Sequence, residues 1–269
     1  MRTSLAHLTV LDATPLELLD AALAGGFQSA GLRIVPPMPT DKIVEVIGNE
    51  PLIRDLIRKM SDTGIDIWDV EAVWLTPDTE ISSLLPALEV GQRLGARHLL
   101  VVGHDPDFNR LADNFSKLCE ECRKYHLGAA LEMMSYVELR TLQQAVKLLQ
   151  TTGQNNASLL IDALHFFRSG AKLEDLRSID PTYFKYLHLC DAPLNSPSVD
   201  GLRAEGRGGR TYPGEAELPL VDLLKALPSH IGVAVEAPNA TLSHLPVAER
   251  AKRCGDATRR VLKDAYGSI

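Results

Sequence analysis

Short apolar runs alternate along the whole chain with longer amphipathic stretches. The apolar runs have the length and composition of buried strands, and the stretches between them are long enough for helices. We expect strands at 4–10, 29–35, 66–75, 98–103, 128–134, 158–164, 183–189 and 231–237. Apolar residues recur at helical spacing in 14–26, 81–96, 107–126, 135–153 and 245–267. The first helix has its own boundary signals, with Thr14 as N-cap, Pro15 in the first turn and Gly25 as the stop.

This alternation predicts parallel strands joined by right-handed crossovers. Eight strand–helix units in 269 residues match a (β/α)8 barrel, and we expect residues 1–269 to form one such domain. A doubly wound open sheet is the alternative, but it usually has a glycine-rich loop after its first strand, where this chain reads TVLDATP. A long Gly- and Arg-rich loop, 190–217, follows the seventh strand, and loops of that length in compact domains are usually functional.

Composition and charge narrow the classes of partner. The formal net charge is -7 and there is no Lys/Arg block, which argues against nucleic-acid binding. No apolar run is long enough to span a membrane, and Asp12 and Pro15 interrupt the N-terminal segment too early for a signal peptide. We therefore expect a cytoplasmic protein with no membrane partner. Cys119 and Cys122 form a C-x-x-C within a predicted helix, without the further ligands of a zinc site.

Titratable side chains recur near the C-terminal ends of the predicted strands, where barrels build their active sites. Asp162, for example, interrupts the apolar run 158–167, and a buried carboxylate is costly unless it is paired or bound to a metal. His165 follows three residues later, beside the same end of the strand. The full set is His7, Arg33, Glu71, His104, Glu132, Asp162, His165, His188 and Glu236.

Four of these residues, Glu132, Asp162, His188 and Glu236, come from the four consecutive strands five to eight. Adjacent strands lie about 4.8 Å apart, so these side chains can converge on one ion. Three carboxylates and one imidazole suit Mn²⁺, Mg²⁺ or Co²⁺ better than a thiolate-seeking metal. We therefore expect one divalent metal ion, with Mn²⁺ as the first choice.

The motifs AALEMM, LIDALH, YLHLCD and VAVEAP, in this order, resemble those of the xylose isomerase-like barrel superfamily of sugar isomerases and epimerases. The resemblance implies an isomerase or epimerase of a small polar carbohydrate or keto acid, acting through a metal-stabilised cis-enediolate. In it, Glu132 and Glu236 would bind metal and also move protons, and His165 would hydrogen-bond the substrate. The family's members often form homo-oligomers.

The same resemblance implies that an arginine of the loop after strand seven orients the substrate. The segment GRGGRTYPGEAELPL offers Arg210 first and Arg207 next, and Arg203 precedes it. Further substrate contacts are expected at His7, Arg33, Glu71 and His104, whereas Trp74 is expected to pack in the core, with an apolar wall of the pocket as the alternative. Arg33 stands where many relatives have a glutamate, and several arginines near a metal favour an anionic substrate.

Three alternatives remain open. The same quartet serves dehydratases of the 3-dehydroshikimate or inosose type, in which His165 or His104 could act as the general acid. Endonuclease IV-type repair enzymes share the quartet but need further ligands for three zinc ions, and the net charge of -7 argues against them. A ligand-binding or scaffold barrel would be expected to show a degraded quartet, whereas this one is intact.

Overall fold

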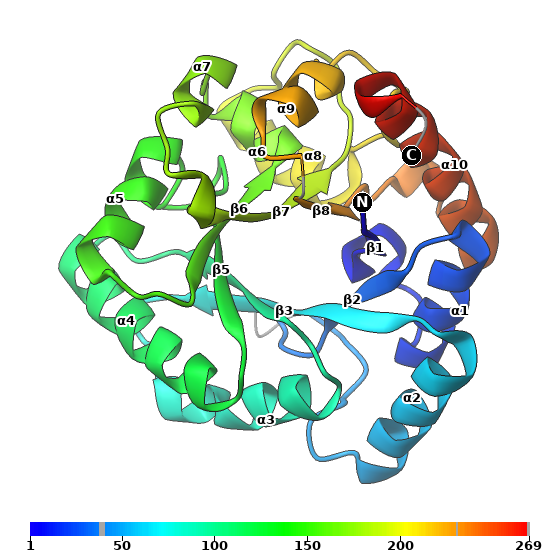
Figure 1. Cartoon of the computed structure of the whole chain (residues 1–269), viewed down its shortest axis with the longest axis horizontal. Helices are drawn as coiled ribbons and strands as arrows, with labels where there is room; N and C mark the ends of the chain where they lie inside the picture. The colour runs from blue at the N-terminus through cyan, green and yellow to red at the C-terminus, as the bar shows by residue number, and fades with distance from the viewer. Residues whose placement is uncertain (38–40, 230, 268–269) are drawn as a thin grey trace.

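Eight parallel strands pair in chain order, and β1 closes the sheet against β8, so the fold is the predicted (β/α)8 barrel (Figure 1). The structure, a computed structural model, describes residues 1–37, 41–229 and 231–267. The strands are β1 (Thr3–Leu5), β2 (Ser29–Arg33), β3 (Asp66–Leu75), β4 (His98–Gly103), β5 (Gly128–Glu132), β6 (Ala157–Asp162), β7 (Phe184–Leu189) and β8 (Gly232–Val235).

The helices surround the barrel (Figure 1). They are α1 (Pro15–Gly25), α2 (Glu50–Thr63), α3 (Leu85–Arg93), α4 (Phe108–Lys124), α5 (Leu142–Thr152), α6 (Ala163–Arg168), α7 (Leu173–Leu176), α8 (Leu202–Gly208), α9 (Leu220–Ala226) and α10 (Val247–Tyr266). Short 3₁₀ helices lie at His7–Val10, Ile81–Leu84, Pro181–Tyr183, Val199–Gly201 and Ala240–Leu242. Among the described residues, no helix is long and apolar enough to cross a membrane.

Local capping chemistry sets the helix ends. Thr14 caps α1 in a reciprocal capping box with Glu17, and Pro15 occupies the first turn, as predicted. The stop is Gly26 rather than Gly25, because Gly26 adopts the left-handed conformation with φ of 73°. The second predicted helix, 81–96, is shorter than expected, since Pro86 is tolerated only in the first turn and α3 therefore begins at Leu85.

The first strand is shorter than the predicted 4–10. It ends at Leu5, and the chain turns into the 3₁₀ helix that starts at His7. The Thr9 hydroxyl holds this turn against the end of β8, since it donates to the carbonyl of Val235 and accepts from the backbone N–H of Ala237. His7 therefore lies at the mouth of the barrel and not within a strand.

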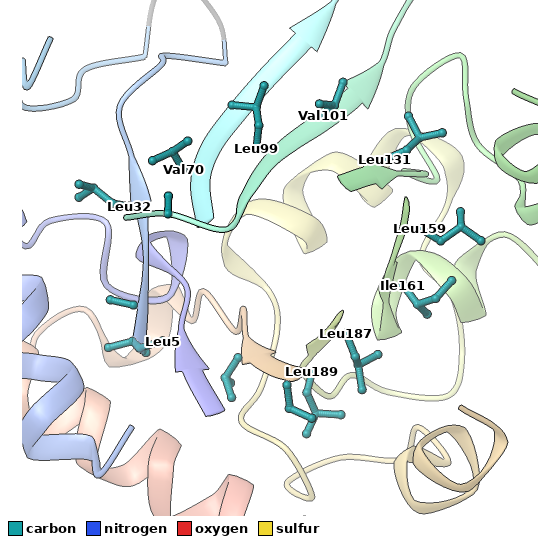
Figure 2. Packing of buried hydrophobic residues seen from close by; sticks show 14 of the residues in the cluster. Leu5, Leu32, Val70, Leu99, Val101, Leu131, Leu159, Ile161, Leu187 and Leu189 are labelled. Atoms are coloured by element: carbon teal, nitrogen blue, oxygen red, sulfur yellow. The ribbon is translucent and has the colours of Figure 1, made fainter. Parts of the chain in front are cut away.

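Alternation along the strands separates an apolar outer layer from the barrel interior. Figure 2 shows outward side chains of this layer, such as Leu159 and Ile161 of β6 and Leu187 of β7, which pack beneath the helices. A smaller apolar cluster, which includes Trp68, Leu160 and Tyr186, fills the interior. Since side chains alternate with period two, the inward positions beyond these residues carry the polar groups of the site.

Candidate metal centre

Four side chains from β5 to β8, which we call the quartet, meet at the C-terminal mouth of the barrel. Glu132 and Asp162 are the last residues of β5 and β6, His188 lies in β7 in register with Asp162, and Glu236 directly follows β8. All four are buried, and one potential ligand atom from each lies within 4.8 Å of the others. The structure therefore brings together all four side chains that the sequence nominated as metal ligands.

Several polar atoms of the quartet have no hydrogen-bond partner among the described residues. They are both carboxylate oxygens of Glu132 and both ring nitrogens of His188. Buried polar atoms without partners are costly, and a cation among them would satisfy several at once. With three carboxylates and one imidazole, the donor set fits an oxygen-preferring divalent metal ion.

The pKa shifts within the quartet also favour a cation at this site. Burial, reinforced by the neighbouring Glu236, raises the pKa of Glu132 well above its ordinary value. Burial alone would lower the pKa of His188, but the carboxylates of Glu236 and Glu132 raise it to about 10. Burial would raise the pKa of Glu236, yet His188 and Arg210 together bring it below its ordinary value. These carboxylates thus depend on nearby positive charge, which a divalent cation supplies most strongly.

Arg210 is buried against the quartet. Its Nη1 lies 2.5 Å from Oδ2 of Asp162, its Nη2 lies 3.1 Å from Oε2 of Glu236, and its Nε donates to the carbonyl of Gly206 at 3.0 Å. The loop arginine that the sequence nominated first is therefore the one that reaches the site. Its contacts here are with two quartet carboxylates, and its contact with substrate stays a prediction.

Asp191, which the sequence analysis did not single out, organises the loop that carries Arg210. Its carboxylate accepts backbone N–H groups from both sides of the loop, at distances of 2.8 to 3.0 Å, namely those of Ala192, Gly214, Ala216 and Leu218. Its backbone also pairs with Thr211, next to Arg210. The signal was present in the sequence, because Asp191 follows a buried strand by only two positions and a buried charge needs partners.

The three predicted histidine contacts differ in their surroundings. His165 is buried between Ser135, whose Oγ lies 3.2 Å from Nδ1, and Arg210, whose Nη2 lies 3.4 Å from Nε2. Its backbone N–H donates to Asp162, and burial lowers the pKa of its ring to about 4. His104 follows β4, half-buried, with its ring edge-on to Trp74 at 5.5 Å.

His7 links two backbone segments. Its Nδ1 accepts the backbone N–H of Arg33 at 3.2 Å, and its Nε2 lies 3.0 Å from the carbonyl of Ala13. Burial lowers its pKa to about 4, which keeps the ring neutral and Nδ1 able to accept. In this structure both ring nitrogens face the backbone, so the visible role of His7 is to hold Arg33 in place.

Opposite the quartet, β2 and β3 contribute a second group of buried charges. Arg33 donates through Nη2 to Oε2 of Glu71 at 3.3 Å, and the hydroxyl of Tyr186 donates to Oδ2 of Asp69 at 3.0 Å. The free oxygens of both carboxylates face Gly31, where a Cβ would come within 2.5 Å of Glu71 Oε1 and 2.6 Å of Asp69 Oδ1. Asp69 was missed, although its spacing of two residues from Glu71 places both on one face of a strand.

A narrow cavity opens beside the quartet. Glu132 and Glu236 line it from the ends of β5 and β8, and Arg33 lines it from the end of β2. Trp74 also lines it and at the same time packs against the interior apolar cluster, so this side chain has both of the roles that the sequence left open. Further lining residues are Leu8, Pro37, Ala72, Leu100, Met134, Tyr136, Arg207 and Arg210.

The sequence matches the model of a known family over most of its length. That family is described as the xylose isomerase-like TIM barrel, and the match covers residues 19–258. A Halalkalibacterium halodurans protein named inosose isomerase is 27% identical over 156 residues, or 56% of this chain and 54% of that protein. An inosose isomerase of Bacillus velezensis is 24% identical over 200 residues, 69% of each chain. The chain thus matches about half the length of the first relative.

Solved structures of similar shape include enzymes that act on sugars. A structure described as IOLI protein with a binding zinc atom aligns over 100% of both chains with a TM-score of 0.83 at 19% identity. A D-psicose 3-epimerase, solved in the presence of D-fructose, aligns over 100% of both chains with a TM-score of 0.75 at 12% identity. At these identities the likeness shows the shared fold.

Proposed function

The chain belongs to the xylose isomerase-like TIM barrel family, and from this membership we propose that it is a divalent-metal-dependent isomerase or epimerase of a small polar carbohydrate or keto acid. The observation that carries the proposal is the quartet, with its unpartnered buried oxygens and nitrogens gathered within 4.8 Å. The similar proteins named inosose isomerase and D-psicose 3-epimerase support the same class of reaction.

Glu132, Asp162, His188 and Glu236 would hold the metal. Once bound, the ion would act as a Lewis acid that polarises a carbonyl and its neighbouring hydroxyl. The donor set favours Mn²⁺, Mg²⁺ or Co²⁺, and the zinc atom named for the similar IOLI structure adds Zn²⁺ to the candidates.

Glu132 and Glu236 would move the protons. Both line the cavity, from strands β5 and β8, so they can reach a substrate carbon from two sides. One carboxylate would remove a proton from the carbon next to the carbonyl, and the other would deliver one, which is general acid–base catalysis. Whether the proton returns to the same carbon or to its neighbour decides between epimerisation and isomerisation.

Other residues would shape the site around this chemistry. Arg210 would orient the substrate while it holds Asp162 and Glu236 in place. Trp74, Met134 and Tyr136 form apolar walls of the cavity, and they would exclude water from the reacting carbon. His165 would donate a hydrogen bond as a neutral ring, since its pKa is lowered to about 4 by burial.

The test combines metal content with proton exchange. We would measure bound metal in the purified protein and then follow solvent deuterium incorporation into panels of ketoses, keto acids and cyclic keto-polyols. About one divalent ion per chain, and exchange that is lost on chelation and restored by Mn²⁺, would support the proposal. No bound metal, even after divalent ions are added back, would contradict it.

The same experiment separates the alternatives. Loss of water from the substrate, seen as a change in product mass, would indicate the dehydratase. That reaction needs a general acid that holds a proton to donate, whereas burial lowers the pKa of His165 to about 4 and leaves its ring neutral near pH 7. Three zinc ions per chain would indicate the repair enzyme.

A further inference from the structure

Arg33 stands at the end of β2 as a buried cation that faces the cavity. Its side chain is 7% exposed, and it lines the same cavity as Glu132 and Glu236. The backbone of Arg33 is held by His7, whose Nδ1 accepts its N–H at 3.2 Å. The guanidinium is thus built into the wall of the barrel and does not belong to a movable surface chain.

The donors of Arg33 are mostly unused. A guanidinium has five N–H donors. Among the described residues, the Arg33 side chain makes one hydrogen bond, through Nη2 to Glu71 at 3.3 Å, and its buried Nε has no partner. A buried donor without a partner is costly, so the site gains if a ligand supplies an acceptor. Carboxylates match the planar fork of a guanidinium best, because they can accept two parallel N–H bonds.

The other cavity-lining arginines are engaged with protein carboxylates. Arg210 contacts Asp162 and Glu236, and Arg207 lies 2.8 Å from Asp41. Glu71 offsets the charge of Arg33 only in part, since burial raises the pKa of Glu71 to about 7. Arg33 is therefore the lining cation with the most capacity left for a ligand, and it lies across the cavity from the proposed proton carriers.

We propose that Arg33 selects the substrate by binding a carboxylate, so that the enzyme acts on a polyhydroxylated keto acid in preference to a neutral sugar. This inference rests on the proposed function for the reacting end of the substrate. The carbonyl end lies between Glu132 and Glu236, while the carboxylate at the other end accepts N–H groups from Arg33. One molecule thereby spans the two walls of the cavity.

The experiment compares two unreactive probes of equal chain length, D-gluconate and D-glucitol, which differ in one terminal carboxylate. Calorimetric titrations are run on the Mn²⁺-loaded wild-type protein and on the variants R33Q, R33K and R203Q. Arg203 is the matched control, because its guanidinium lies over Trp74 at 6.0 Å and R203Q removes the same charge near the cavity. Circular dichroism verifies the fold of each variant.

We expect the wild type to bind D-gluconate at least tenfold more tightly than D-glucitol. R33Q removes that preference and leaves D-glucitol binding within twofold, R33K retains an intermediate preference, and R203Q behaves as the wild type. Equal affinities for the two probes in the wild type, a preference that survives in R33Q, an equal loss in R203Q, or no measurable binding of D-gluconate would each overturn the inference.

The outcome is separable from that of the proposed function. Metal content and solvent exchange are measured independently, and the titrations are repeated without added metal. An Arg33-dependent preference in a protein that neither holds metal nor exchanges protons would leave the carboxylate site standing and remove the proposed reaction. Metal binding and proton exchange, together with no effect of R33Q on the preference for D-gluconate, would support the proposed reaction and remove the carboxylate site.

Discussion

The two walls of the cavity differ in how their charged groups are satisfied. On the β5–β8 wall, the quartet leaves both oxygens of Glu132 and both nitrogens of His188 without hydrogen-bond partners among the described residues. On the β2–β3 wall, Arg33 pairs with Glu71, and Asp69 accepts the hydroxyl of Tyr186. The β5–β8 wall has unpartnered ligand atoms that suit a cation, whereas the charged groups of the β2–β3 wall are partly paired with other protein groups.

This difference separates two kinds of buried charge. Buried ligand atoms that converge from several strands, most of them without a hydrogen-bond partner among the described residues, suggest a metal site. Paired groups that keep spare donors or acceptors indicate architecture and substrate selection. We therefore expect substitutions on the β5–β8 wall to affect catalysis and metal binding, and those on the β2–β3 wall to affect stability and specificity.

The largest expected effect comes from Glu132. E132Q keeps the shape of the side chain but removes the group that accepts or delivers a proton, and general acid–base groups contribute roughly 10²- to 10⁴-fold to rate. Solvent deuterium exchange should fall by about that factor. The matched control E71Q removes a carboxylate of the same size from the other wall and should slow exchange at least an order of magnitude less. Equal losses of exchange rate in E132Q and E71Q would show that the two walls do not differ in their contribution to catalysis.

The next largest effect concerns metal affinity. D162N retains an oxygen that can accept the backbone N–H of His165 and cap α6, but it removes a ligand charge. Changes in groups that merely support ligands cost about 10- to 100-fold in affinity, so loss of a ligand charge should cost at least about 100-fold. Competition with a chromophoric chelator measures this, and D69N on the other wall should bind metal nearly as the wild type does. Unaltered affinity in D162N would remove Asp162 from the donor set.

A smaller effect is expected from Tyr186, which links the two walls. Its hydroxyl donates to Asp69 across the barrel interior, and Y186F would leave that buried oxygen without its partner. An unsatisfied buried group costs about 1 to 3 kcal/mol. Urea denaturation should show a loss of this size in the free energy of unfolding, and D69N/Y186F should recover part of it. A double variant that is no better than Y186F would show that the hydrogen bond is not the source of the loss.

The fold and the quartet were predictable from sequence for a common physical reason. Parallel strands alternate inward and outward residues, so a carboxylate or imidazole at the end of an apolar run must lie at the barrel mouth, as Asp162 and His188 do. The paired groups were harder to identify. Asp69 lies inside a strand and Asp191 inside a loop, and each depends on partners distant in the chain, such as Tyr186 and Leu218.

Details of local structure were also difficult to predict from the sequence. The extent of the first strand was wrong because the turn at His7 depends on hydrogen bonds to the end of β8, more than 200 residues away in the chain. Helix α2 was not among the predicted helices, although Asn49 caps it and Gly64 ends it. The sequence could not decide between core packing and the pocket wall for Trp74, because the surroundings of a side chain at the mouth depend on loops whose path the sequence does not reveal.

The remaining expected effect is a pH dependence of stability that belongs to the β2–β3 wall. Burial raises the pKa of Glu71 from 4.5 to about 7 and that of Asp69 from 3.8 to about 6. The folded protein therefore keeps protons that the unfolded chain has already released. This contribution is complete below about pH 4 and is lost as the pH rises to about 7, at a slope of about 1.4 kcal/mol per pH unit for one group.

A comparison of the wild type with E71Q isolates the contribution of Glu71 to this pH dependence of stability. The quartet titrates in both proteins, so its contribution cancels in the difference between their free energies of unfolding. Urea denaturation of the Mn²⁺-loaded proteins at pH 5, 6 and 7 should show that the wild type loses stability relative to E71Q as the pH rises. Parallel curves would mean that Glu71 keeps its charge throughout this range. Arg33 would then be neutralised by its own partner, and the two walls would no longer differ in the charge that they offer a substrate.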